Sequence, residues 1–175
     1  MSSQRIHSRV KALKLAFSSW VPTSNEQKAL SLRKYVKELG RVDQIWLWLN
    51  SNHGSIMAVD APHALHPEKF NYQELSEKIS CAASAFRSFG IKRGDVVALF
   101  SENSPRWLIA DQGIMRLDAS NAVRGASAPL DELRYILNDS KAVAIVVQTA
   151  ELWKKLDLPE EQKSQFKLIL QLEGE

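Results

Sequence analysis

From residue 71 onward, the apolar residues alternate between a pattern typical of helices and a pattern typical of strands. Helical stretches carry apolar residues three or four positions apart, as in Leu75, Ile79 and Ala83, whereas other stretches are short apolar runs between polar turns. Because helices and runs alternate, we expect an α/β fold, a parallel sheet with helices on both faces. The runs predict strands at residues 96–100, 119–123, 143–147 and 167–172.

Residue types at the ends of these stretches support the same fold class. Asn71, with Glu74 three residues later, has the pattern of a capping box at a helix start, and Gly90 suits the end of that helix. Ser104 and Pro105 suit the cap and the first turn of the next helix. The sequence therefore indicates where the helices of the repeat begin.

The residues before position 71 follow other patterns. Leu32, Val36 and Leu39 are spaced as on one face of a helix at residues 26–39, and a second helix is expected at 43–51. Five consecutive apolar residues in the second helix, from Ile45 to Leu49, predict burial on more than one side. We predict four regions: a basic tail or amphipathic segment (residues 1–25), a helical region (26–54), a β-hairpin (55–72) and the βαβ repeat (72–175).

Charge is unevenly distributed along the 175 residues. Residues 1–42 hold nine Lys and Arg against Glu26 and Glu38, a charge of +7, whereas the remaining 14 Lys and Arg are set against 18 acidic residues, a charge of −4. The two regions are therefore expected to have different surroundings. The single cysteine, Cys81, excludes an internal disulfide and favours a reducing compartment.

The first 25 residues are basic and serine-rich, with no acidic residue. On a helix, Val10, Leu13 and Phe17 would share one face. Three interpretations stay open, namely a frayed basic tail, a helix on an anionic membrane surface, and an organelle transit peptide. We expect a cytoplasmic protein, peripheral to the membrane in the second case, with the chloroplast as the alternative, and we expect no nucleic-acid partner.

Three residues are candidates for metal binding or nucleophilic chemistry. His63 and His66 lie three positions apart in a loop, but no cluster of Cys, Asp or Glu completes a metal site, so a solvated loop is favoured. Cys81 lies beside the apolar face of its helix, which predicts a buried or half-buried, inert thiol.

Polar residues follow two of the predicted strands. Ligands of open α/β sheets bind at the carboxyl ends of the strands, and Glu102, Asn103 and Arg124 lie there. Capping and packing account for Glu102 and Asn103. For Arg124, a role as a surface or ion-pair residue is favoured over a phosphate contact.

A family resemblance rests on two long segments. FNYQELSEKISCAASAFRSFGIKRGDVVALFSENSPRWLIADQGIM (residues 70–115) and NAVRGASAPLDELRYILNDSKAVAIVV (residues 121–147) resemble the N-terminal part of the AMP-forming acyl-activating enzymes. Ile45, Trp46 and the run from Ala58 to His63 are similar to the long-chain acyl-CoA and acyl-acyl-carrier-protein synthetases of cyanobacteria and chloroplasts. The resemblance implies that the βαβ repeat (72–175) is a partial AMP-binding-type domain, the first half of the large acyl-adenylate-forming domain, preceded by a helical region.

The same resemblance implies a fatty-acid ligase. Such enzymes join a fatty acid to ATP, assisted by Mg²⁺, and then pass the acyl group to coenzyme A or to acyl carrier protein. No stretch of the sequence matches the family's phosphate loop, adenine-site motif, ribose-binding aspartate or catalytic lysine. We therefore assign no catalytic, cofactor-binding or metal-binding residue, and no cofactor, to this chain. The family's Gly-Ala pair is replaced by Asp118 and Ala119, at the start of the second strand.

These observations favour an N-terminal fragment of a long-chain fatty-acid ligase that is inactive alone. The alternative is a non-catalytic module, derived from such a ligase, that binds a membrane or a protein. A small flavodoxin-like binding domain is a third hypothesis. An open sheet edge would also allow self-association, with Leu168, Ile169 and Leu170 of the last strand as the exposed set.

Overall fold

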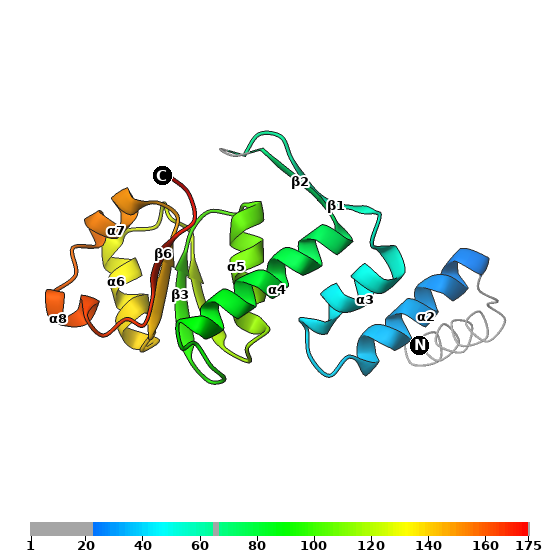
Figure 1. Ribbon diagram of the computed structural model, residues 1–175, viewed down its shortest axis with the longest axis horizontal. Coiled ribbons are helices and arrows are strands. Elements are labelled where there is room, and N and C mark those ends of the chain that lie inside the picture. Colours follow the sequence, from blue (N-terminus) through cyan, green and yellow to red (C-terminus); the bar gives the residue numbers. More distant parts are fainter. Residues whose placement is uncertain (1–22, 65–66, 175) are drawn as a thin grey trace, which may run out of the picture. The chain divides into compact units, whose positions relative to one another are not determined.

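The computed structural model describes residues 23–64 and 67–174 (Figure 1). The chain divides into two compact units, residues 1–42 and 43–175. None of the described helices is both long enough and apolar enough to cross a lipid bilayer.

The first unit contains one described helix, α2 (Ser24–Glu38). A capping box begins it, because the Thr23 hydroxyl accepts a hydrogen bond from the Glu26 amide at 3.4 Å and the Glu26 carboxylate accepts one from the Thr23 amide at 2.8 Å. The helix predicted at residues 26–39 is confirmed, and it begins two residues earlier than predicted. The predicted face of Val10, Leu13 and Phe17 lies outside the described residues.

The second unit begins with a helix and a β-hairpin that pack against α4. Phe70, Leu75 and Ile79 form the buried centre of this corner, and the Trp46 indole donates a hydrogen bond to the Gln112 side-chain oxygen at 2.6 Å. The predicted hairpin is confirmed as an antiparallel pair. The elements are α3 (Gln44–His53), β1 (Met57–Ala61), β2 (Glu68–Asn71) and α4 (Tyr72–Ser88).

The rest of the second unit is a four-stranded, fully parallel sheet with the strand order β4-β3-β5-β6. The two central strands, β3 and β5, are apolar along almost their whole length and buried, as expected for strands covered on both faces. The strands are β3 (Val96–Phe100), β4 (Ser120–Arg124), β5 (Ala144–Val147) and β6 (Ile169–Gln171).

Alternate residues of the central strands serve two separate cores. Val97 and Leu99 pack toward α4 and α5, whereas Ala98 and Phe100 pack toward α6 and α7. Helices therefore cover both faces of the sheet, and the predicted fold class is confirmed. The helices of the repeat are α5 (Pro105–Met115), α6 (Leu130–Asp139), α7 (Ala150–Leu156) and the short α8 (Glu160–Lys163).

The contact between α4 and α5 depends on a glycine. A Cβ atom at Gly113 would lie 2.9 Å from the Cβ of Ala82 and 3.2 Å from the amide nitrogen of Ala83. No side chain fits at such distances, so Gly113 lets the two helices approach closely. This contact fixes the position of α4 above the sheet.

Two expectations about burial were wrong. Cys81 is exposed, because it lies outside the buried face of α4, which Ile79, Ala83 and Phe86 form. No residue of α3 is fully buried and Leu47 is 45 % exposed, because α3 packs on α4 from one side. A run of apolar residues in a helix need not be surrounded by protein.

The replacement of the family's Gly-Ala pair falls in a turn. Asp118 lies before β4, is exposed, and has a φ of 57°. Glycine adopts this left-handed conformation freely, and aspartate is among the few other residues that tolerate it. The carboxylate is therefore accommodated ahead of the strand.

Candidate functional site at the carboxyl edge of the sheet

The strand order defines where a ligand would be expected. The connection after β3 leads to α5 on one face, and the connection after β5 leads to α7 on the other, so the order of the strands reverses between them. We call the four segments after the strands the carboxyl edge. They are residues 101–104, 125–129, 148–149 and 172–174.

Glu102 joins two of these segments. Its carboxylate accepts hydrogen bonds from the Ser127 amide at 3.0 Å and from the Ser127 hydroxyl at 2.9 Å. These bonds lower the pKa of the Glu102 carboxyl below its ordinary value. A Cβ atom at Gly125 would lie 3.1 Å from the same carboxylate, so the small residue lets the loop fold close around it.

Gln148 joins the remaining segments. Its side-chain oxygen accepts a hydrogen bond from the Glu102 amide at 3.2 Å, and its side-chain nitrogen donates to the carboxylate of buried Glu173 at 3.2 Å. The loops after β3, β4, β5 and β6 are thus tied together by side chains. Sequence reasoning named Glu102 but missed Gln148 and Ser127, although the same rule about strand ends points to Gln148.

Arg124 is engaged by a neighbour. Its guanidinium donates two hydrogen bonds to the Glu132 carboxylate, at 2.7 and 3.3 Å. The ion pair favoured for Arg124 from the sequence is confirmed. This two-bond geometry fixes the guanidinium beside α6.

Two hollows flank Glu102 and Gln148. One, of about 440 Å³, lies between the hairpin residues 60–64 and the loop containing exposed Asn103. The other, of about 570 Å³, is lined by residues of α7 and by the loop after β4, including Lys155. Both are open, and Glu102 lines each of them.

The carboxyl edge does not fit the triphosphate of ATP. A triphosphate requires basic side chains or a cradle of backbone amides. The described residues of this edge include Glu102 and Glu173 and no Lys or Arg, which gives a charge of −2. The amide of Ser127 already donates to Glu102.

Only one of the two candidate metal ligands lies in the part of the chain that the structure describes. His63 is exposed in its loop, and His66 lies outside the described residues. Within residues 23–64 and 67–174, no group of three or more His, Cys, Asp or Glu side chains is arranged to hold a metal ion.

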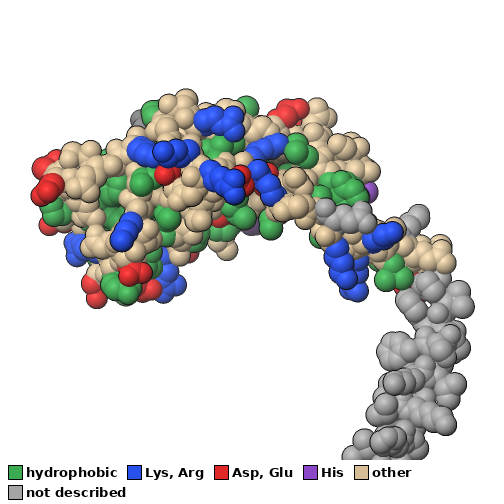
Figure 2. Space-filling model, turned by 90° about the horizontal axis from the view of Figure 1, so that it is seen from below, with side chains coloured by type: hydrophobic (Ala, Val, Ile, Leu, Met, Phe, Trp, Pro, Cys, Tyr) green, Lys and Arg blue, Asp and Glu red, His purple; other side chains and the backbone are tan. Residues whose placement is uncertain are grey.

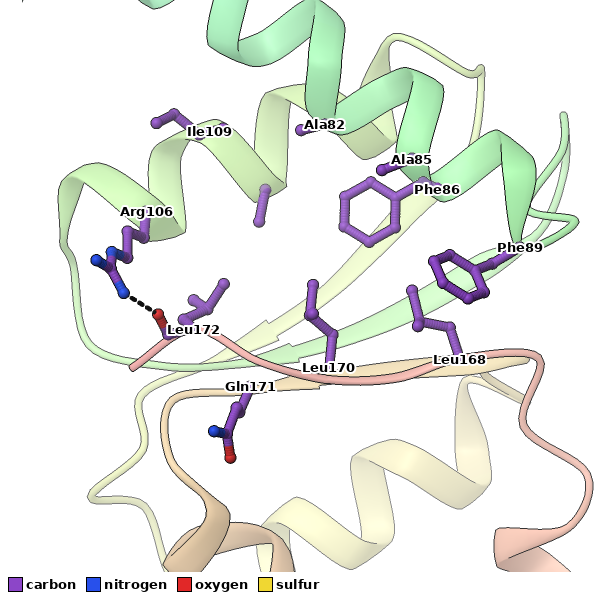
Figure 3. Close-up of a pocket in the computed structure, with 11 residues that line it drawn as sticks. Ala82, Ala85, Phe86, Phe89, Arg106, Ile109, Leu168, Leu170, Gln171 and Leu172 are labelled. Atoms are coloured by element: carbon purple, nitrogen blue, oxygen red, sulfur yellow. Dashed lines mark hydrogen bonds between the residues drawn. The ribbon is translucent and has the colours of Figure 1, made fainter. Parts of the chain in front are cut away.

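An apolar groove lies on the α4–α5 face of the sheet, beside β6. It has a volume of about 250 Å³ and runs from Phe89 and Leu168 to Leu172 and Arg106 (Figure 3). At the latter end the Arg106 guanidinium donates a hydrogen bond to the Leu172 carbonyl at 2.7 Å. Phe86, Ile109 and Leu170 also line it. Of the set predicted for self-association, Leu168 and Leu170 line this groove and Ile169 is 41 % exposed.

Comparison with known proteins identifies a family. Residues 50–174 match the family described as "AMP-binding enzyme". A chloroplastic long-chain-fatty-acid–[acyl-carrier-protein] ligase of Arabidopsis thaliana is 33% identical over 172 residues, which are 98% of this chain and 23% of that protein. A second Arabidopsis protein, described as "probable acyl-activating enzyme 16, chloroplastic", is 36% identical over 134 residues, 77% of this chain and 19% of its own length. The chain thus spans about a quarter or less of the length of these relatives.

Two solved structures have a similar fold. The N-terminal domain of FACL13 from Mycobacterium tuberculosis superposes with a TM-score of 0.69 at 16% identity, over 76% of this chain and 33% of that one. A long-chain-fatty-acid-CoA ligase from Archaeoglobus fulgidus gives a TM-score of 0.67 at 23% identity, over 76% of this chain and 27% of that one. These likenesses concern the fold.

Proposed function

The chain belongs to the AMP-binding enzyme family, and from this membership we propose that residues 43–174 form the first part of the large domain of a long-chain fatty-acid ligase. In the proposed reaction a fatty-acid carboxylate attacks the α-phosphate of ATP, which releases pyrophosphate and forms an acyl adenylate. A thiol of coenzyme A or of acyl carrier protein then takes the acyl group and releases AMP. ATP, Mg²⁺ and the acyl acceptor are requirements of the whole ligase.

One observation carries this proposal. The match to the family extends over nearly the whole α/β unit, and the relative that aligns with 98% of the chain is described as a long-chain fatty-acid ligase. The family resemblance predicted from the sequence is confirmed by the same match. The choice of fatty acid as substrate class follows the relative and is part of the proposal.

We also propose that the 175 residues do not form acyl adenylate by themselves. The sequence has no segment that matches the family's phosphate loop or catalytic lysine. The acidic carboxyl edge, with Arg124 held by Glu132, supports the same proposal. In this view the unit provides a scaffold on which other parts of a ligase pack.

A graft tests the ligase proposal. Residues 1–175 would replace the aligned segment of the Arabidopsis acyl-carrier-protein ligase, and fatty-acid-dependent exchange of labelled pyrophosphate into ATP would be measured. We expect the graft to exchange and the isolated chain to match a protein-free control. A Leu99→Asp graft, which places a carboxylate in the buried sheet, is the inactive control. A folded graft without exchange, or exchange by the isolated chain, would contradict the respective proposal.

A non-catalytic binding module is the second candidate function, and α2 favours it. Leu32, Tyr35 and Val36 of α2 are 38, 40 and 44 % exposed, and Arg33 and Lys34 lie on the same helix. Such a helix suits an anionic membrane surface, consistent with the +7 charge of residues 1–42. Sedimentation with anionic vesicles at low and high salt is the test, and equal binding by a chain without residues 1–25 would count against a role for those residues.

Three further statements stay predictions. We expect the protein in the cytoplasm, at a membrane surface if the second candidate holds, with the chloroplast as the alternative suggested by the names of the relatives. We expect no nucleic-acid partner. The third prediction is self-association through β6. Light scattering of the purified chain over a concentration series would test it.

A further inference from the structure

The edge of the sheet opposite the carboxyl edge is basic. We call the four turns that enter the strands the amino edge; they are residues 89–95, 116–119, 140–143 and 164–168. These turns contain five basic and two acidic residues, a charge of +3. Figure 2 views the molecule from this side and shows Lys and Arg side chains gathered on it. The basic residues are Lys92, Arg93, Arg116, Lys141 and Lys167, and the acidic ones are Asp95 and Asp118.

Three of these basic side chains are available to a partner. Lys92, Arg93 and Lys141 are exposed, and their side chains form no hydrogen bond or salt bridge with the residues that the structure describes. Lys92 acts on the Asp95 carboxylate only through its charge, as one of the weaker causes that lower the pKa of Asp95. Lys167, by contrast, donates to the Asp95 carboxylate at 2.6 Å and to the Gly90 carbonyl at 3.1 Å. Because Lys167 neutralises Asp95, the free charge of this edge is predominantly positive.

A large aromatic side chain projects beside the basic ones. Phe89 follows the last turn of α4, three residues before Lys92, and is 54 % exposed. It forms one end of the apolar groove, next to Leu168 (Figure 3). Exposed apolar surface beside polar and charged residues is typical of an interaction site.

We propose that the amino edge docks on an anionic lipid bilayer. Lys92, Arg93 and Lys141 would contact the headgroups, Phe89 would lie at the level of the headgroups and upper acyl chains, and the groove behind Phe89 would be covered by hydrocarbon. Charge complementarity favours this partner, because flexible Lys and Arg side chains reach lipid phosphates in many geometries while an aromatic ring partitions into the interface. The surface is separate from residues 1–42, and the inference does not depend on the ligase proposal.

Binding by the full chain to vesicles of phosphatidylcholine, with and without phosphatidylglycerol, tests the proposal. The variant Lys92→Glu/Arg93→Glu is compared with the control Lys154→Glu/Lys155→Glu. The control changes the net charge by the same amount, but on α7, where Lys155 lines a hollow at the carboxyl edge. Each Lys or Arg near such a surface contributes about 1 kcal/mol, so loss of the two attractions alone should weaken partitioning about 30-fold, and the two added carboxylates should weaken it further. The control should change it less than about threefold, because charges beyond a Debye length are screened.

A local probe distinguishes insertion from general attraction. In a Cys81→Ser background, an environment-sensitive fluorophore would be attached at Phe89→Cys, and in a control at Tyr135→Cys on α6, where the native side chain is 66 % exposed. We expect a blue shift with anionic vesicles at position 89 and none at position 135. Melting curves in the absence of lipid would verify that both pairs of variants are folded.

Three results would overturn the proposal. Equal weakening by the two charge variants would assign binding to overall charge or to residues 1–42. An unchanged spectrum at position 89 would exclude insertion. Dimerisation without lipid that Phe89→Ala abolishes would assign this edge to a contact between copies of the chain.

Discussion

The two edges of the sheet differ in how they use their polar side chains. At the carboxyl edge, Glu102, Gln148 and Glu173 satisfy one another and the loops around them, and the described residues carry a charge of −2. At the amino edge the charge is +3, and Lys92 and Arg93 extend into solvent beside Phe89. At the edge where α/β sheets usually bind ligands, the polar side chains are used in hydrogen bonds to one another, whereas the opposite edge has exposed basic side chains and open apolar surface.

This difference separates two roles of polar residues. Side chains that bond to one another fix the loops of a scaffold but leave little capacity for a ligand. Side chains without a partner add little to stability and are available for recognition. The first arrangement suits the proposed part of a larger ligase, and the second suits a docking surface.

The largest expected contrast is between two phenylalanines. Phe100 ends β3 at the carboxyl edge and is completely buried, whereas Phe89 at the amino edge is 54 % exposed. Phe100→Ala should lower the free energy of unfolding by about 3–5 kcal/mol because it leaves a cavity, and Phe89→Ala by less than about 1 kcal/mol. Urea unfolding of both variants measures this. Similar losses in the two would show that Phe89 is part of the core and not an exposed anchor.

A smaller loss of stability is expected when the ion pair between Lys167 and Asp95 at the amino edge is removed. Lys167→Met removes the bonds to Asp95 and Gly90, and because the Asp95 side chain is only 11 % exposed we expect a loss of about 1–2 kcal/mol. Lys163→Met is the matched control. Lys163 pairs with Glu160, which is 89 % exposed, and its loss should cost about 0.3 kcal/mol. If the two substitutions cost the same, burial of Asp95 does not strengthen its pair.

The smallest effect concerns acid stability at the carboxyl edge. Bonds from Ser127 lower the pKa of Glu102 in the folded protein from its ordinary value of 4.5. Glu102 therefore stabilises the fold above about pH 4.5, and this contribution is lost as the pH falls through the lowered pKa. Glu102→Gln should reduce the acid-induced fall in melting temperature.

Ser127→Ala supplies the comparison for Glu102. It removes the hydroxyl donor but keeps the amide donor, so its effect on the pH dependence should be in the same direction and smaller. A pH dependence unchanged in both variants would mean that Glu102 and Ser127 do not interact in solution.

Much of the local structure was predictable because its causes are local. The capping box of Asn71 and Glu74, the Ser104–Pro105 helix start and the apolar strands each depend on residues a few positions apart. For the same reason, Glu102 and Arg124 could be placed at strand ends. The identity of the family was also readable, because it rests on long segments of sequence.

The tertiary structure decided what depends on residues far apart in the chain. The order β4-β3-β5-β6 places Gln148 beside Glu102, 46 positions earlier in the sequence, and no local pattern indicates that contact. The exposure of Cys81 and Leu47 likewise depends on which side of a helix another element covers. The elements follow from short-range sterics and periodicity, and the family follows from long segments of sequence, so both could be inferred before the fold was known. Packing alone decided which polar groups are satisfied and which remain free, because each partner comes from a different strand or helix.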